Sequence, residues 1–349
     1  MTTFQNGAVI DTRTEEQKKK DWKQSEVLAS ASPVNWVEKL QSQWRKFPIF
    51  SQGVSGSCVA QTEAKEMGIM RWLKDNVYVH FSATDIYQPR ANKPDPGMAG
   101  NDARNIVAKR GATLEVLTPS QMLTDAQMDS AVVEPYKRAV GEVFKVPNYL
   151  TWKEGELGNI EIIASTIQAT GKGIMVWFYF KGDEWTERPT VKYPTLVLEA
   201  SDTLRHSVTA VDYCLVNGVK CLIIEDSWGP GAGIGGQRVI DENFFKARNW
   251  YASYLVNFIF DAQQVQKPYY IFSVDLEYGM TGADVKALQD CLKYEGLFPV
   301  NADSTGTFDS ITKKGVQDFQ IKYAITTVGG AGYGRVGPKT RGKLNFLFS

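Results

Sequence analysis

The sequence contains few of the residues on which several classes of protein depend. It has two histidines, His80 and His206, and four cysteines among 349 residues. Four cysteines in a chain of this length exclude a small scaffold held together by disulfides. Two histidines exclude a multi-histidine metal centre. Any chemistry that depends on histidine must therefore use one of these two side chains.

The chain also lacks net charge and long apolar runs. Its 39 Lys and Arg residues balance 39 Asp and Glu residues, which argues against a protein that binds nucleic acid or an anionic membrane by charge alone. No stretch reaches the roughly 18 apolar residues that a membrane span needs. The first residues contain no apolar core of a secretory signal. A cytoplasmic location is expected by default, or release by lysis if the chain is phage-encoded. Neither nucleic acid nor membrane is an expected partner, and the oligomeric state is not indicated.

The character of the sequence changes twice along its length. Residues 1–33 are polar and rich in charge, which predicts an N-terminal extension. Residues 34–262 show helical spacing first and strand patterns after about residue 170, an order that indicates an α+β domain. After a linker around Pro268, residues 273–349 return to helical spacing and predict a small three-helix domain. No internal repeat is evident.

Local patterns predict the elements around the candidate chemistry. Residues 58–73 and 101–109 are expected to form helices, the second ended by Gly111. Residues 173–180 read as a buried strand. These elements place a helix-rich half before a strand-rich half.

A β-hairpin is expected around Asn217-Gly218, with strands over residues 207–216 and 219–224. With a two-residue turn, Cys214 and Cys221 lie directly opposite each other. They fall at a hydrogen-bonded pair, where side chains are farther apart. Free thiols are therefore expected rather than a disulfide.

A cysteine follows a Gly/Ser turn in residues 51–60, SQGVSGSCVA, where a helix is expected to begin. The thiolate is the nucleophilic form of cysteine, and the N–H groups at a helix N-terminus and a nearby imidazolium both favour it. His206 leads into an apolar strand. Asp226 follows another strand, where its carboxylate can orient an imidazole. Cys58, His206 and Asp226 are thus the candidate nucleophile, base and orienting residue.

These residues give the chain a resemblance to papain-like cysteine peptidases. Cys58 and His206 are 148 residues apart, within the roughly 130–150 residues found between these groups in that family. Gln52 lies six residues before Cys58, as the oxyanion glutamine of the family does. The sequence Ser227-Trp228-Gly229 also matches. The resemblance covers about residues 36–260.

The resemblance implies a two-lobed fold, with a helical lobe and a β-barrel lobe, that hydrolyses peptide bonds through a thioester on Cys58. It implies that Gln52 donates to the oxyanion and that Trp228 borders the cleft and shields the His–Asp contact. Gly97 and Met98 are the nearest candidates for the segment that binds the substrate backbone. The implied partner is a polypeptide substrate, and no metal or organic cofactor is implied.

Two positions depart from the pattern of the family. Val59 stands where an aromatic residue is usual, and Asp226 stands where asparagine is usual. An aspartate accepts a hydrogen bond from the imidazole as asparagine does, but it holds the imidazolium more strongly. We therefore expect a changed pH profile more than a changed mechanism.

The C-terminal residues resemble a peptidoglycan-binding-like three-helix domain. The matching pieces are residues 279–289, the turn at residues 305–308, Phe319-Gln320 and residues 336–340. Peptidoglycan is the partner that this resemblance implies. Domains of this kind also act as spacers or as contacts between proteins.

Other readings of the same residues remain open. A lone cysteine is more often a buried structural thiol, a lone histidine a satisfied core residue, and an aspartate after a strand a turn cap. The chain would then be a non-catalytic cell-wall-binding or virion protein that retains the fold. A third reading is a hydrolase of peptidoglycan stem peptides.

Overall fold

The computed structural model describes residues 7–9, 13–19, 32–40, 42, 47–185, 190–191, 204–260, 267–298 and 304–349. The predicted extension over residues 1–33 lies mostly outside them. Within it, Thr14 caps the short helix α1 (Glu15–Lys18). The chain divides into two compact units, and the second combines Ile259–Ser349 with Arg110–Thr118 and Val132–Lys145. The domain boundaries predicted from sequence stay a prediction.

Seven strands form one sheet in the order β1-β7-β2-β4-β5-β6-β3. The sheet is open, so the expected β-barrel was wrong. Closing a barrel requires its edge strands to pair. Here β1 and β3 lie at the two ends of the strand order and do not pair with each other among the described residues, and β3 pairs in parallel with β6. The strands are β1 (Phe144–Thr151), β2 (Ile174–Phe180), β3 (Thr190–Val191), β4 (Leu204–Val216), β5 (Val219–Glu225), β6 (Gln237–Asp241) and β7 (Asn249–Phe260).

The helices confirm the α+β class and the predicted helix stop at Gly111. Helix α5 ends just before Gly111, and α3 ends just before Asn76, two residues beyond the predicted end; both residues that follow the helices adopt the left-handed conformation that ends many helices. The helices of this part are α3 (Cys58–Asp75), α4 (Ala83–Tyr87), α5 (Gly100–Arg110), α6 (Asp125–Asp129), α7 (Pro135–Glu142), α8 (Ile160–Thr170), α9 (Gly182–Trp185) and α10 (Glu242–Arg248). Among the described residues, none of the helices has the length and apolar character needed to cross a membrane.

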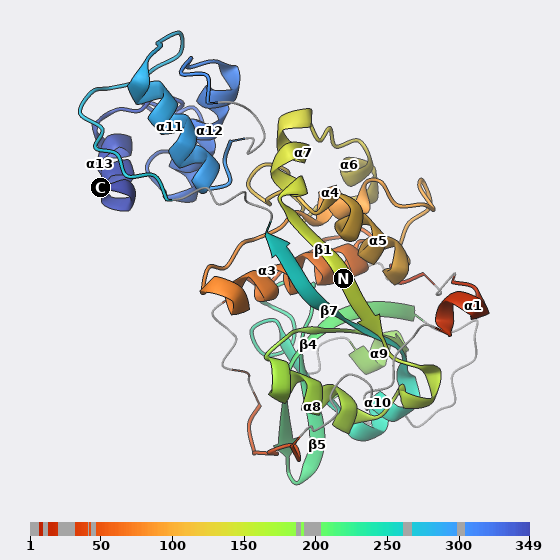
Figure 1. The fold of residues 1–349 in the computed structure, drawn as a ribbon. Helices are drawn as coiled ribbons and strands as arrows, with labels where there is room; N and C mark the ends of the chain where they lie inside the picture. Colours follow the sequence, from red (N-terminus) through yellow and green to blue (C-terminus); the bar gives the residue numbers. More distant parts are fainter. Residues whose placement is uncertain are drawn as a thin grey trace. The chain divides into compact units, whose positions relative to one another are not determined.

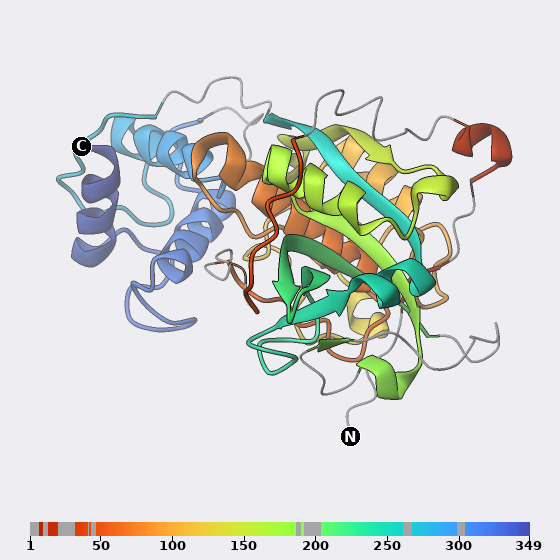
Figure 2. The same cartoon turned by 90° about the horizontal axis from the view of Figure 1, so that it is seen from below.

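Helices cover both faces of the sheet (Figures 1 and 2). On one face, Ile69 of α3 packs near Ile223 of β5. On the other face, α8 and α10 pack near Leu222 and Ile224 of the same strand. Because successive side chains of a strand point to opposite faces, one apolar strand supplies both cores.

The predicted hairpin between β4 and β5 is confirmed. Asn217 and Gly218 have φ values of 52° and 77°, which is the backbone that a two-residue type I′ turn requires. Cys214 pairs with Cys221 in the register, and both are buried free thiols as expected. Because β5 runs antiparallel to β4, the end of β5 lies near His206 of β4.

The C-terminal domain has the three expected helices, α11 (Ala283–Tyr294), α12 (Ser310–Lys322) and α13 (Pro338–Phe348). Val285, Leu288 and Leu292 form the buried face of α11, as their spacing predicts. Cys291 is a further free thiol in this core.

Two buried glutamines hold this domain together in the same way, so the expectation of no internal repeat was wrong. Gln289 accepts from Gly306 N–H at 2.9 Å and donates to Thr307 O and Thr312 Oγ1, each at 2.9 Å. Gln320 repeats this pattern in the second half. It accepts from the N–H of Gly334 at 2.8 Å and donates to the carbonyl of Arg335 at 2.8 Å and the hydroxyl of Thr340 at 2.9 Å.

Replacing Gln320 with leucine is expected to destabilise the domain by at least ~2 kcal/mol, because each buried polar group left without a partner costs about 1–3 kcal/mol. The measurement is amide hydrogen exchange of residues 304–349 in the full chain. Gln317→Leu, which alters a half-buried residue of the same helix, is the matched control. Equal protection in both variants would contradict the role of the glutamine.

Candidate active site

Cys58 is the first residue of α3 and is fully buried. The preceding turn is tight, since Gly53 adopts a φ of 64° and Ser57 takes the N-cap position. As the first residue of the helix, Cys58 has a backbone N–H that belongs to the set without a partner inside the helix. The thiol therefore lies where the helix favours an anion, as predicted.

His206 lies in β4 and reaches Asp226, which directly follows β5. The ring Nε2 and Asp226 Oδ1 are 2.7 Å apart, and both side chains are buried. The other ring nitrogen, Nδ1, makes no hydrogen bond of ordinary geometry among the described residues. The Cys58 side chain interacts with the imidazole ring. The three candidate residues are thus brought together from α3, β4 and the end of β5.

The charges of this group stabilise one another. Burial opposes the charge of His206, but the Asp226 carboxylate and the Cys58 side chain outweigh it and raise the pKa of His206 to about 9. Burial likewise opposes the charge of Asp226, but His206, Arg238 and a hydrogen bond from Trp185 lower its pKa to about 2. At neutral pH the imidazolium and the carboxylate are both charged.

Aromatic rings enclose the imidazole. The centroid of half-buried Trp228 lies 5.2 Å from that of His206, in the shielding position that was predicted. A second indole, Trp185 of α9, lies 5.9 Å from His206, and its Nε1 donates to Asp226 Oδ2 at 2.9 Å. Sequence reasoning missed Trp185, because nothing local to its short helix indicates which strand end it meets.

Arg238 is the second functional neighbour that sequence reasoning missed. It lies in β6, is buried, and donates from Nε to Asp226 Oδ2 at 3.1 Å. A signal was present, because Arg238 directly precedes the apolar residues Val239 and Ile240 in this short strand. A buried cation in such a strand requires an anion.

Gln52 lies in the loop before Cys58 and is fully buried. Its Nε2 donates to Ser55 O at 2.7 Å, and its Oε1 accepts from Ser227 Oγ at 2.6 Å. Its backbone N–H also donates to Ser227 O at 2.8 Å. The glutamine therefore links the nucleophile loop to the segment after Asp226, and its role as oxyanion donor stays a prediction.

The Gly97-Met98 segment, predicted to bind the substrate backbone, holds the N-terminal residues of this chain. Met98 N–H donates to Gly7 O at 2.7 Å, and Val9 N–H donates to Met98 O at 3.0 Å, in a parallel bridge. A Cβ placed on Gly7 would lie 1.6 Å from the carbonyl oxygen of Gly56. Residues 7–9 therefore lie against the turn that leads into Cys58.

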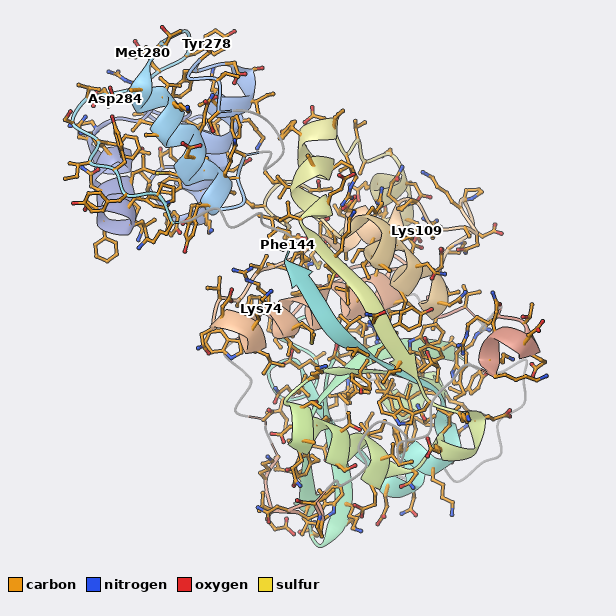
Figure 3. The ribbon with its side chains drawn as sticks, viewed as in Figure 1. Lys74, Lys109, Phe144, Tyr278, Met280 and Asp284 are labelled. Atoms are coloured by element: carbon orange, nitrogen blue, oxygen red, sulfur yellow. The ribbon has the colours of Figure 1, made fainter. Side chains whose placement is uncertain are left out.

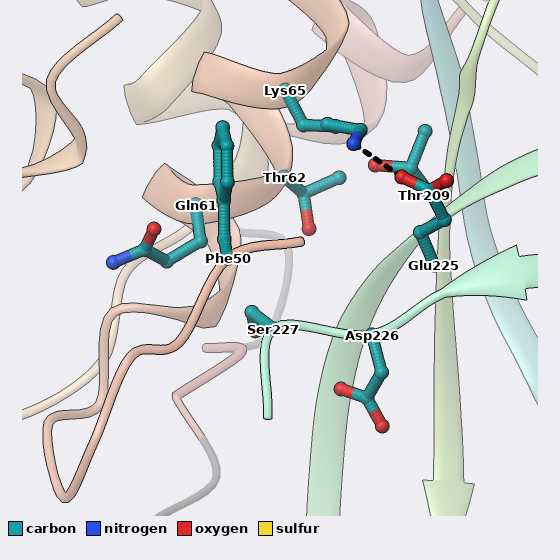
Figure 4. A pocket seen from close by; sticks show the side chains of 8 residues that line it. All are labelled: Phe50, Gln61, Thr62, Lys65, Thr209, Glu225, Asp226 and Ser227. Atoms are coloured by element: carbon teal, nitrogen blue, oxygen red, sulfur yellow. Dashed lines mark ion pairs between the residues drawn. The ribbon is translucent and has the colours of Figure 1, made fainter. Parts of the chain in front are cut away.

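A small cavity lies between α3 and the end of β5 (Figure 4). Its volume is about 10 Å³, which is room for one water molecule. Lys65 and Glu225 form a buried ion pair across it, next to Asp226. The pair ties the helix that carries Cys58 to the strand that ends directly before Asp226.

Comparison with solved structures finds the same arrangement of chain. Xylellain, a cysteine protease from Xylella fastidiosa, superposes with a TM-score of 0.57 and 18% identity, over 74% of this chain and 98% of that one. Digestive procathepsin L2 from the larval midgut of Tenebrio molitor gives a TM-score of 0.55 and 19% identity, over 73% and 79%. The fold is that of papain-like cysteine proteases. No curated protein sequence matches the chain.

The papain-like fold is joined to a recognised C-terminal domain. Residues 281–344 match the family model of a peptidoglycan binding domain. Both resemblances expected from sequence are thereby confirmed at the level of fold. The roles of the individual site residues stay predictions.

Stability of the papain-like unit is expected to depend on pH through the His–Asp pair. The folded pKa of His206, about 9, lies above its ordinary 6.5, so its contribution is present below pH 6.5 and is lost as pH rises through 9. The folded pKa of Asp226, about 2, lies below 3.8, so its contribution is lost as pH falls through 2. Urea unfolding between pH 6 and 10 tests the alkaline part. A His206→Gln variant that shows the same alkaline loss would contradict it.

Proposed function

We propose that this protein is a cysteine peptidase whose nucleophile is Cys58. The observation that carries the proposal is the buried contact of His206 with Asp226 beside a thiol at the start of a helix. An imidazolium fixed by a carboxylate stabilises a thiolate and can later return its proton. The papain-like fold supports the same assignment.

In the proposed reaction, the Cys58 thiolate attacks the carbonyl carbon of a peptide bond and forms a C–S bond. The oxyanion is stabilised by the Cys58 backbone N–H and by Gln52. His206 gives its proton to the leaving nitrogen as the C–N bond breaks. Water then attacks the thioester, His206 accepts a proton from it, and the thiolate leaves.

A peptide-library cleavage profile of the full chain tests this proposal. The wild type is expected to cleave peptide bonds and to be labelled at Cys58 by a thiol-directed epoxide, while Cys58→Ala does neither. Cys291 serves as an internal control for labelling, because burial, together with Asp290 and Glu295, raises the pKa of its thiol to about 12. A wild type that is unlabelled at neutral pH and cleaves no unfolded substrate would sink the proposal.

Residues 7–9 are expected to restrict access to the nucleophile. Gly7→Val places a side chain against the Gly56 backbone, so the segment must move away. We predict that labelling of Cys58 then becomes several-fold faster, because the backbone groups of Met98 become available. Gly155→Val is the matched control, since no atom lies within 4 Å of its added Cβ. Equal rates in the two variants would show that the segment does not limit access.

We further propose that the C-terminal domain binds peptidoglycan and targets the peptidase to cell walls. The match of residues 281–344 supports it. So do exposed aromatic rings, because the flat faces of sugar rings pack on such rings. Tyr278 is 62% exposed, close to Met280 and the start of α11 (Figure 3), and Phe346 is 79% exposed.

Sedimentation with purified peptidoglycan tests this second proposal. The wild type and Cys58→Ala are both expected to sediment, whereas a chain that lacks residues 273–349 stays in solution. If Cys58→Ala retained every measurable property of the wild type, the non-catalytic wall-binding reading would replace the peptidase. Cleavage of crosslinked muropeptides but not of casein would favour a hydrolase of stem peptides, which the peptidoglycan-binding domain also supports.

A further inference from the structure

The Asp226 carboxylate is held from two sides. Oδ1 meets His206 Nε2 at 2.7 Å, while Oδ2 accepts from Arg238 Nε at 3.1 Å and from Trp185 Nε1 at 2.9 Å. The side chains of His206, Asp226 and Arg238 are all at most 1% exposed. Solvent therefore does little to screen the charges of this group.

Strand pairing and two aromatic rings fix the position of Arg238. Arg238 lies opposite Ile224 in the β5–β6 ladder, two residues before Asp226. Its guanidinium carbon is 5.7 Å from the ring centroids of both Trp185 and Trp228. The same two indoles border His206, so one aromatic enclosure holds the cation and the imidazole on either side of the carboxylate.

The charges explain why this arrangement suits an aspartate at this position. With asparagine, a thiolate and an imidazolium form a neutral pair. With Asp226 alone, the same pair would carry a net charge of −1 in a buried site, which is costly. Arg238 brings the sum of the four groups to zero.

We propose that Arg238 is a positioning residue that keeps Asp226 on His206 and offsets the carboxylate charge, so that the imidazolium can release its proton to the leaving amine. Without this cation, the carboxylate would bind the imidazolium proton more tightly and weaken His206 as an acid. The inference rests on the proposed peptidase for its catalytic meaning. Its test measures the pH dependence of the Cys58–His206 pair and does not require peptide cleavage.

The experiment measures the rate of alkylation of Cys58 by iodoacetamide against pH, with mass spectrometry to assign the site. The alkaline limit is the pH at which His206 loses its proton, seen as the upper break in the profile of rate against pH. In Arg238→Met this limit is expected to move up by about one pH unit, because the charge of the Asp226 carboxylate is no longer offset. In Asp226→Asn it is expected to move down by about one unit or more, because the cation remains and the carboxylate is gone.

The double variant Asp226→Asn/Arg238→Met checks that the two single shifts oppose each other, and its alkylation rate at pH 7 tests whether the two residues are coupled. It removes both charges, so its alkaline limit is expected to return to within about half a unit of the wild type. Its alkylation rate at pH 7 is expected to exceed that of either single variant. Arg238→Lys keeps the charge and is expected to keep the alkaline limit. Thermal unfolding of each variant confirms that the proteins compared are folded.

Limits that move in the same direction in both single variants would overturn the proposal. So would a double variant whose alkylation rate at pH 7 is lowered by the product of the two factors found for the single variants, since the residues would then act independently on that rate. If the shifts occur as expected but the wild type cleaves no peptide, the positioning role stands and the proposed peptidase function fails.

Discussion

Replacing His206 with glutamine is expected to slow the alkylation of Cys58 at pH 6 by on the order of a hundred-fold. A cysteine without a cationic partner has a pKa near ~8.5, so less than about 1% of it is thiolate at pH 6. In the wild type, the imidazolium stays charged at this pH because burial is outweighed by Asp226 and Cys58, which raise the pKa of His206 to about 9. Iodoacetamide labelling followed by peptide mass spectrometry gives the rate.

The other histidine supplies the matched control. His80 stacks on Phe50 with 4.3 Å between the ring centroids, and burial, assisted by Lys65, lowers its pKa to about 4. It is therefore neutral at pH 6, and His80→Gln is expected to leave the alkylation rate unchanged. A His206→Gln variant that reacts as fast as His80→Gln would show that no ion pair activates the thiol.

Replacing Arg104 with methionine is expected to cost about 3–5 kcal/mol of unfolding free energy, the usual loss when one partner of a buried ion pair is removed. Arg104 of α5 donates to Glu63 at 2.7 Å and to Glu66 at 2.8 Å, both on α3, and all three side chains are at most 1% exposed. Its Nε also donates to Ser253 at 3.2 Å. The variant leaves two buried carboxyl groups without their cation on the helix that carries the nucleophile. Urea unfolding at pH 7 measures the loss.

Glu66→Gln is expected to cost far less at the same pH. Burial, together with the neighbouring Glu63, raises the pKa of Glu66 to about 8 despite Arg104, so its carboxyl is mostly neutral at pH 7. The folded chain keeps a proton that the unfolded chain releases near pH 4.5, so wild-type stability falls as pH rises from about 4.5 to 8. The glutamine variant is expected to lack this slope. Equal losses of unfolding free energy in Arg104→Met and Glu66→Gln would contradict this account of the buried Arg104–Glu63–Glu66 cluster.

Sequence patterns predicted the elements that carry the chemistry because those patterns are local. The turn and helix start at Cys58, and the hairpin at Asn217-Gly218, depend on neighbouring residues. The spacing of Cys58 and His206 added a long-range prediction only through a family resemblance. The structure then showed that the candidate residues come together.

Features that depend on tertiary partners escaped prediction. Trp185 and Arg238 reach Asp226 from elements that no local pattern connects to it. The open sheet also depends on partners, since it is decided by which strands pair at the two ends of the strand order. The repeat in the C-terminal domain was hidden because Gln289 and Gln320 stand out only when their hydrogen bonds are seen.

The complete burial of Cys58 has a consequence for the lifetime of the protein. Oxidation of a cysteine to sulfenic and higher acids requires both thiolate character and access to the oxidant. A buried sulfur is protected from peroxide for as long as the enclosure holds. On the function proposed above, the event that admits a peptide also admits the oxidant, so oxidation of Cys58 is expected during turnover rather than at rest.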